Sequence, residues 1–295
     1  HQPWPLTATP RYVVNDGFRM PAGFPIDGFR SGLQYRARPG DVFIATYPKC
    51  GTTWAQHIVY LILHRGDPLP AGRNMTEEIP HLEEVGKAAA ERIAEPRCIK
   101  THLPFDLTPW HPDARYLYVA RNPLDCAVSF FHHTRGFVKL YDFADGTFDE
   151  FFECFLSGEI DFGDYFDNLV PWFAHQGDDN LLFLTYEQMK AAPAAAVVAM
   201  GEFLGPEPAR TVHDPATLDS IIRHSSFDSM RKDPERWSSK RPDGMPAFIR
   251  KGQIGDWVNH FSREQAHRLA DKFARRAEGT DLETLWPEIL AAARG

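Results

Sequence analysis

Short apolar runs recur along the chain, each followed by a longer segment whose apolar residues repeat at helical spacing. The clearest runs are VFIATY at residues 42–47, YLYVA at 116–120 and LLFLT at 181–185, and residues 97–100 form a shorter candidate. The three clear runs do not alternate polar with apolar residues, as a strand with one wet face does. Continuous apolar strands are typical of a parallel sheet with both faces covered.

Helical patterns follow these strands and indicate an α/β domain. We expect one domain over residues 41–295, with a central parallel sheet flanked by helices. Residues 1–40, rich in Pro, Gly and aromatics, are expected to form an irregular arm packed on it. The polar, Pro- and Gly-containing segment 233–255 is expected to be a lid or binding loop. The helical patterns cover residues 52–64, 123–133, 148–156, 165–175, 194–204, 216–223 and 263–276.

Composition narrows the class of protein. The 295 residues are 43% hydrophobic and 24% charged, as in ordinary soluble globular proteins. Apolar runs such as residues 58–63 are far shorter than the roughly 20 residues of a membrane span. The formal net charge of −8 disfavours a protein that coats nucleic acid, but it allows a local basic pocket for a phosphorylated small molecule. The four Cys residues form no C-x-x-C pair, which predicts free thiols and a reducing, cytoplasmic compartment.

The strongest local signal is TYPKCGTTW at residues 46–54, between the first strand and the first helix. A helix that starts after a buried strand directs free N–H groups and the positive end of its dipole at one spot, which suits a phosphate. Gly51 permits close approach of the backbone and Lys49 adds a positive charge. Thr52 and Thr53 add hydroxyls, one of which would cap the helix. An ordinary strand-to-helix turn with a surface lysine fits the same residues.

This loop differs from the P-loop of nucleoside-triphosphate hydrolases and kinases, which reads G-x-x-x-x-G-K-[ST]. Here Lys49 precedes Gly51, and no glycine lies five residues before the lysine. A P-loop kinase is therefore disfavoured, and a different phosphate-bearing cofactor fits better.

TYPKCGTTW resembles the 5′-phosphosulfate loop of the cytosolic-type sulfotransferases, which use 3′-phosphoadenosine 5′-phosphosulfate (PAPS). Further segments match in family order: KTHLP at 100–104, YVARNP through SFFH at 118–132, YEQMK at 186–190, HSSF at 224–227 and RKGQIGDW at 250–257. The chain is thus identified as a member of this family, with a P-loop-like strand–loop–helix. The resemblance implies PAPS as co-substrate, 3′-phosphoadenosine 5′-phosphate (PAP) as product, no metal, and a small-molecule acceptor with a hydroxyl or an amine.

The resemblance also implies catalytic roles. His102 would be the general base, because a neutral imidazole accepts a proton near pH 7. Lys49 would contact the bridging oxygen of the leaving group, and Lys100 would stabilise the transferring SO₃. Arg121, at the end of a strand where α/β sheets bind ligands, would hold the 3′-phosphate with Ser129. Ser129 would also restrain the lysine until an acceptor binds.

Further residues are implied as cofactor contacts. Trp54 and Phe227 would pack on the adenine, with polar contacts from Tyr186 and Ser225. Without the resemblance, each of these aromatics is equally an ordinary core residue, and the paired basic residues at 250–251 are an exposed pair. The remaining implied contacts are Cys50, Gly51, Thr52, Thr53, Phe248, Arg250, Lys251 and Gly252.

The chain departs from the family pattern at three places. Cys50 stands where Ser is common, so a backbone N–H rather than the weaker thiol donor is expected to contact phosphate. The acceptor side reads PHLEE at 80–84 where phenol-type members have P-F-L-E-F, and His133 follows the SFFH match without an aromatic. These changes predict a more polar or wider acceptor pocket. Residues 258–267 lack the dimer motif K-x-x-x-T-V-x-x-x-E, which leaves a monomer or a different dimer open.

Two alternatives stay open beside the transferase. One is an enzyme of this fold that uses sulfonation to drive an elimination, which only the chemistry of the acceptor distinguishes. The other is a non-enzymatic nucleotide-binding module. The joint presence of Lys49, Lys100 and His102 argues against the module, because binding PAP does not require a base.

Overall fold

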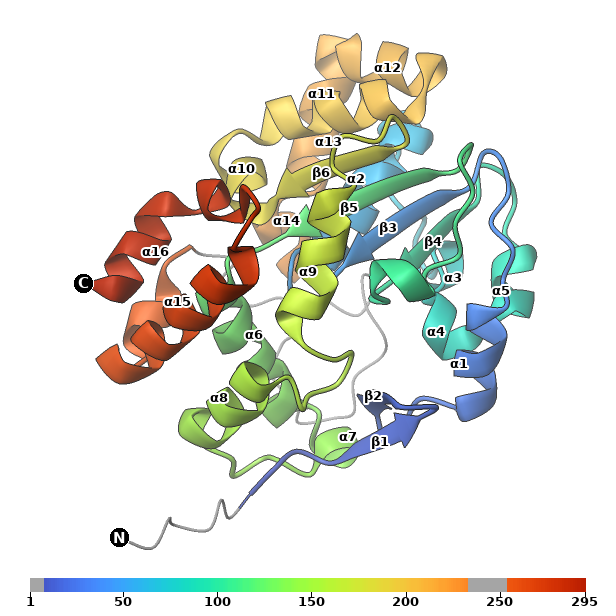
Figure 1. Ribbon diagram of the computed structural model, residues 1–295. Helices are drawn as coiled ribbons and strands as arrows, with labels where there is room; N and C mark the ends of the chain where they lie inside the picture. Colours follow the sequence, from blue (N-terminus) through green and yellow to red (C-terminus); the bar gives the residue numbers. More distant parts are fainter. Residues whose placement is uncertain (1–7, 233–253) are drawn as a thin grey trace, which may run out of the picture.

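The computed structural model describes residues 8–232 and 254–295. Within this part of the chain, four parallel strands form the central sheet in the order β4-β3-β5-β6 (Figure 1). They are β3 (Val42–Thr46), β4 (Cys98–Thr101), β5 (Arg115–Ala120) and β6 (Leu181–Thr185). Because β4 and β5 lie on opposite sides of β3, the strand order reverses there, and the carboxyl ends of these strands form the usual ligand-binding edge of such a sheet.

Helices cover both faces of the sheet (Figure 1). Successive residues of β3 point to opposite faces: Phe43 belongs to one hydrophobic core cluster and Ile44 to the other. The Ile44 face packs against α2 (Thr52–Leu63), α11 (Pro193–Leu204) and α13 (Pro215–His224). The Phe43 face packs against α6 (Pro123–Gly136), α8 (Phe148–Ser157), α9 (Tyr165–Ala174), α15 (Arg263–Ala277) and α16 (Pro287–Arg294).

Shorter helices connect these strands and helices along the chain. They are α3 (Met75–Glu78), α4 (Leu82–Val85), α5 (Lys87–Glu91), η1 (Phe105–Leu107), α7 (Val138–Tyr141), α10 (Tyr186–Ala191), α12 (Pro206–His213), α14 (Phe227–Arg231), η3 (Asp256–Asn259) and η4 (Leu282–Leu285).

The predicted parallel sheet and the predicted helices are confirmed, with ends shifted by a few residues. The sequence analysis missed α12 and α16. Both begin with a proline, Pro206 and Pro287, at the first helical position, where its fixed φ and missing N–H cost nothing. That signal would have located both starts.

The prediction of an irregular arm is wrong for residues 12–33. They form a hairpin, β1 (Tyr12–Asn15) and β2 (Phe18–Pro21), followed by α1 (Ile26–Leu33). The hairpin turn is Asp16-Gly17, and both residues have positive φ, at 53° and 83°. This is the backbone that a two-residue hairpin turn needs, and Asp-Gly is among its preferred pairs. The dipeptide was visible in the sequence.

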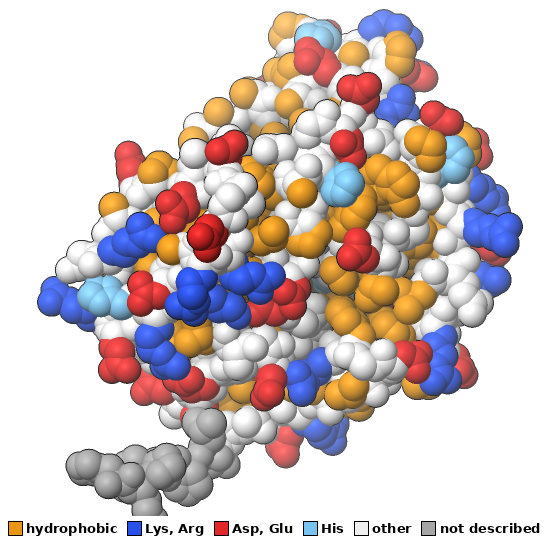
Figure 2. Space-filling view, in the orientation of Figure 1, with side chains coloured by type: hydrophobic (Ala, Val, Ile, Leu, Met, Phe, Trp, Pro, Cys, Tyr) orange, Lys and Arg blue, Asp and Glu red, His pale blue; other side chains and the backbone are white. Residues whose placement is uncertain are grey.

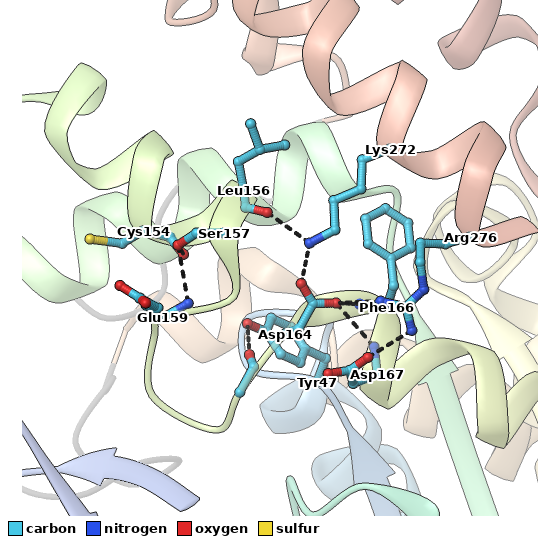
Figure 3. Close-up of polar contacts among 11 residues, drawn as sticks. Tyr47, Cys154, Leu156, Ser157, Glu159, Asp164, Phe166, Asp167, Lys272 and Arg276 are labelled. Atoms are coloured by element: carbon cyan, nitrogen blue, oxygen red, sulfur yellow. Dashed lines mark hydrogen bonds and ion pairs between the residues drawn. The ribbon is translucent and has the colours of Figure 1, made fainter.

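The segment before α9 is fixed on two sides (Figure 3). Asp164 caps α9 by accepting from the N–H groups of Phe166 and Asp167, at 2.8 and 3.1 Å. Its carboxylate also pairs with Lys272 and Arg276 of α15. One residue earlier, the carbonyl oxygen of Gly163 accepts a hydrogen bond from the hydroxyl of Tyr47, a residue of the TYPKCGTTW segment.

The cysteines are confirmed as free thiols, and all four are buried. Among the residues that the structure describes, no helix is both long and apolar enough to cross a membrane.

Candidate active site

The loop between β3 and α2 has the geometry of an anion site. Lys49 and Gly51 both have left-handed backbones, with φ of 66° and 93°. A Cβ at Gly51 would lie 3.0 Å from the ring of Tyr186, so the loop leaves no space there for a side chain. Gly51 is also the N-cap of α2 and provides no side-chain cap. The amide groups of the first helical turn are therefore left for a ligand.

The prediction that Thr52 or Thr53 caps this helix is wrong. The helix begins at Thr52 itself, one residue too late for either threonine to be the N-cap. The hydroxyl of Thr52 instead lies 2.5 Å from the hydroxyl of Thr46 at the end of β3. This contact fixes the strand end to the start of the helix.

Arg121 reaches the same loop from the end of β5. Its guanidinium donates a 3.0 Å hydrogen bond to the carbonyl oxygen of Lys49 and lies 4.3 Å above the ring of Tyr186. The hydroxyl of Tyr165 donates to the carbonyl oxygen of Arg121 at 2.5 Å. The structure thus brings both predicted basic residues, Lys49 and Arg121, to the N-terminus of α2. Positive charge and unsatisfied amides together favour a phosphate.

The predicted adenine-binding aromatics form one cluster beside this loop. Ring centroids lie 5.2 Å apart for Trp54 and Phe227, and 5.6 Å apart for Trp54 and Tyr186. The sequence analysis did not assign Lys190, whose ammonium lies 4.4 Å above the ring of Phe227, although it ends the matched segment YEQMK. Ser225 is buried and donates its hydroxyl hydrogen to the carbonyl oxygen of Ile221, 2.7 Å away, so only the oxygen's lone pairs can meet a ligand.

His102 follows β4 and is buried. Its Nδ1 lies 2.8 Å from the carbonyl oxygen of Thr46. A carbonyl can only accept, so Nδ1 carries the proton and Nε2 of the neutral ring is a proton acceptor. The carboxylate of Glu83 accepts from the backbone N–H of His102 at 3.1 Å and from the hydroxyl of Thr101 at 2.9 Å. Position and tautomer of the imidazole are both fixed.

Burial keeps His102 neutral. It lowers the pKa of the imidazole well below 6.5, and the positive charges of Lys100 and His81 lower it further. Burial also lowers the pKa of Lys100, while Glu84 and Glu83 oppose that shift. Burial therefore favours the unprotonated form of the His102 imidazole and weakens the preference of Lys100 for its charged form.

Two acidic residues near the site were not predicted. Glu83 has no exposed surface, and Asp125 is buried at the start of α6. Asp125 accepts from the backbone N–H groups of Gly255 and Trp257, at 2.9 and 3.2 Å, and so fixes this part of the GDW segment to α6. Glu83 lies in PHLEE, where the chain departs from the family pattern, and Asp125 in the matched stretch 118–132, but nothing in a local sequence pattern shows that a carboxylate is buried.

Of the remaining predicted site residues, the structure describes Ser129 and Cys50. Ser129 lies on α6 and is partly buried. The thiol of Cys50 points into the core, 3.7 Å from the sulfur of Cys126, so its backbone rather than its side chain is left to face a ligand. Phe248, Arg250, Lys251 and Gly252 lie outside the described residues.

Aromatic side chains pack around His102 on the side where an acceptor would bind. Phe162 packs edge-on against His102 with ring centroids 5.0 Å apart, and Phe24 packs against Phe162 at 5.8 Å. Figure 2 shows hydrophobic side chains gathered on this face of the molecule, between α9 and α4. Among residues 8–232 and 254–295, no group of three or more His, Cys, Asp or Glu side chains is arranged to hold a metal ion.

Known proteins resemble this chain over most of its length. The family model described as a sulfotransferase domain matches residues 39–281. Human sulfotransferase 1C2 is 34% identical over 272 residues, which cover 87% of this chain and 90% of that protein. Rabbit amine sulfotransferase is 33% identical over 269 residues, or 85% of each chain. A crystal structure of mouse sulfotransferase SULT7A1 complexed with PAP superposes with a TM-score of 0.74 at 25% identity, covering 95% of this chain and 99% of that one.

Proposed function

This chain belongs to the sulfotransferase family, and we propose that it transfers a sulfuryl group from PAPS to a hydroxyl or amine of a small-molecule acceptor, with His102 as general base. The observation that carries the proposal is the state of His102. It is buried and neutral, its Nδ1 is hydrogen-bonded to the carbonyl oxygen of Thr46, and the anion-binding loop departs from this same Thr46.

The residues present fit PAPS. One phosphate fits the left-handed loop at Gly51 and the uncapped start of α2, and a second fits the guanidinium of Arg121 at the end of β5. An adenine ring fits beside Trp54 and Phe227. The PAP complex of the mouse relative supports this cofactor. When bound, PAPS supplies the sulfuryl group that the reaction moves.

The chain's own residues supply the rest of the chemistry. Nε2 of His102 accepts the proton of the acceptor, while Nδ1 keeps its hydrogen bond to Thr46 and holds the ring in place. Lys49 and the amides of the α2 N-terminus neutralise negative charge that grows on the departing phosphate. Lys100 lies on β4, two residues before His102, and stabilises the negative oxygens of the group in transfer. Arg121 and Ser129 hold the 3′-phosphate.

The acceptor side combines the aromatic rings of Phe24 and Phe162 with polar His81, and on that polar residue we favour a polar acceptor over a simple apolar phenol. His81 lies on it with its ring centroid 5.0 Å from that of His102. Both the hydroxyl and the amine remain candidates, and one relative in the comparison is named an amine sulfotransferase. Screening PAPS turnover with matched polar and apolar phenols and amines tests this: a steep preference for a small apolar phenol contradicts it.

The first experiment is a calorimetric titration of the full chain with PAP, beside ATP and AMP. Micromolar or tighter binding of PAP with weak binding of ATP is the expected result. His102→Ala should then bind PAP as the wild type does and lose about 10²–10⁴-fold in turnover, the usual contribution of a general base. His213→Ala, at an exposed histidine paired with Glu202, is the matched control and should keep full turnover. A folded protein that does not bind PAP, or a His102→Ala variant with near-normal turnover, overturns the proposal.

A further inference from the structure

A buried ion pair lies directly against the proposed base and has no role in the mechanism above. Nε2 of His81 lies 2.6 Å from a carboxylate oxygen of Glu83, and Nδ1 of the same ring lies 3.5 Å from Glu84. The side chains of His81 and Glu83 are 8% and 0% exposed. Removing two charges from water at this depth costs free energy, which only their mutual attraction and further hydrogen bonds can offset.

One carboxylate connects the two histidines. Glu83 pairs with the ring of His81 and also accepts the backbone N–H of His102. The two imidazole rings meet edge to face, with centroids 5.0 Å apart and planes at 84°. Phe162 closes the third side, at 5.0 Å from His102 and 5.9 Å from His81. No bulk water separates rings at this distance, so a charge on one acts on the other at low dielectric.

The short helix that carries Glu83 is held in place by α1. A Cβ on Gly28 or on Gly32 would collide with the carbonyl oxygens of Glu84 and Leu82, so α1 packs directly on the backbone of α4. Glycine is the residue that allows such close packing. Both residues of the ion pair lie at the start of α4, and the close packing of α1 fixes that helix in place.

Charged and titratable groups from several elements face His102. Lys100 lies on β4 beside it, His133 lies on α6, and His81 and Glu83 come from the start of α4, while the Thr46 carbonyl of β3 accepts from the ring. Burial works against a charged His81, but the carboxylates of Glu83 and Glu84 outweigh it and raise the pKa of His81 above 6.5. The surroundings thus shift the two rings in opposite directions, His81 toward the protonated form and His102 toward the neutral form.

We propose that the Glu83–His81 ion pair is a positioning device for His102. The pair holds a positive charge against the His102 ring, and this charge keeps Nε2 of His102 free to accept a proton. The proposal rests on the proposed role of His102 as base. The two histidines then have different tasks: His102 takes the proton of the acceptor at Nε2, and His81 keeps its own. Repulsion between the two rings also favours release of the proton from His102 to water after the product leaves.

The test compares the wild type with His81→Phe and His81→Gln. Phenylalanine keeps a ring of similar size without the charge, and glutamine keeps a polar contact with Glu83 without the permanent charge. In both variants the pKa of His102, followed by NMR of the labelled imidazole in the full chain, should rise by about one unit or more. The fall of kcat/KM on the acid side should then be centred about one pH unit higher in the variants than in the wild type.

His213→Gln is the matched control and should leave both readouts unchanged. Binding of PAP by each variant shows that it is folded, and the glutamine variant keeps the test available if the phenylalanine variant does not fold. An unchanged His102 pKa and an unchanged acid limb in either folded variant overturn the proposal. A shifted pKa of His102 together with normal turnover of His102→Ala instead refutes the base assignment and leaves the coupling between the two rings standing.

Discussion

The hydroxyl of Tyr47 donates a 2.8 Å hydrogen bond to the carbonyl oxygen of Gly163. Tyr47 begins the loop that would hold phosphate, and Gly163 follows Phe162, whose ring packs against His102. Asp164, the next residue, is tied to Lys272 of α15. A hydrogen bond therefore joins the proposed cofactor side to the proposed acceptor side. Their relative position does not depend on the sheet alone.

Removing this hydroxyl by Tyr47→Phe should lower the free energy of unfolding by about 1 kcal/mol, because the partly buried carbonyl oxygen of Gly163 loses its donor. Tyr47 is almost fully buried, so water cannot readily replace the hydroxyl. Urea unfolding of both proteins measures the difference, and equal midpoints and slopes contradict the prediction. Binding of PAP should change little, because the hydroxyl faces away from the loop.

Arg121 tests the phosphate site. Arg121→Ala should weaken PAP binding about 10- to 100-fold, the usual value of a charge-assisted contact with phosphate. Arg121→Lys should lose less, because it keeps the charge and loses only the planar fork. Calorimetry at two salt concentrations should show a weaker salt dependence for the alanine variant. Unchanged affinity in Arg121→Ala would show that the 3′-phosphate is held elsewhere.

Cys50 and Gly51 should respond in opposite ways although they are neighbours. The thiol of Cys50 faces Cys126, so Cys50→Ser should keep PAP affinity within about twofold of the wild type. Gly51→Ala places a Cβ at a left-handed position 3.0 Å from Tyr186 and should weaken both stability and PAP binding, with a cost of about 1–2 kcal/mol. Thermal unfolding and PAP titration of the two variants give the comparison. A serine variant that binds much more weakly than the alanine variant reverses the argument.

We predict that the buried carboxyl of Asp161 makes the free energy of unfolding depend on pH. Burial raises the pKa of its carboxyl to about 7, although the hydrogen bond from Tyr141 opposes that shift. In the unfolded chain the same carboxyl ionises near 3.8. Between these pH values the folded state holds the proton and the unfolded state releases it, so this group makes stability fall as pH rises from about 4 to 7.

Asp161→Asn removes that titration and should be stabilising at pH 8. Its advantage over the wild type should grow between pH 4.5 and pH 8 by on the order of 2–4 kcal/mol and then stay level. Urea unfolding at several pH values measures it. Asp219→Asn, at an exposed carboxylate paired with Arg223, is the control and should show no such trend. A difference that is the same at all pH values contradicts the raised pKa.

Local patterns were sufficient for much of the fold and of the cofactor side. A buried strand that ends in a glycine-containing turn predicts a helix N-terminus open to anions, and the structure has this geometry at Gly51. The prediction of an irregular arm failed for a different reason. The Asp16-Gly17 turn signal was present, but residues 1–40 were judged on their overall Pro and Gly content, which obscured a two-residue hairpin.

The amino-acid sequence by itself determined the parallel sheet, the family, and the positions of Lys49, His102 and Arg121, because each of these depends on residues close together in the chain. Only the tertiary structure decided the state of His102. Its tautomer depends on the carbonyl of Thr46 on another strand, and its low pKa depends on burial and on neighbours from β4, α4 and α6. The same holds for Glu83, a residue that a sequence would place at the surface. Charge, burial and hydrogen bonding are properties of what surrounds a side chain, and folding assembles those surroundings from distant segments.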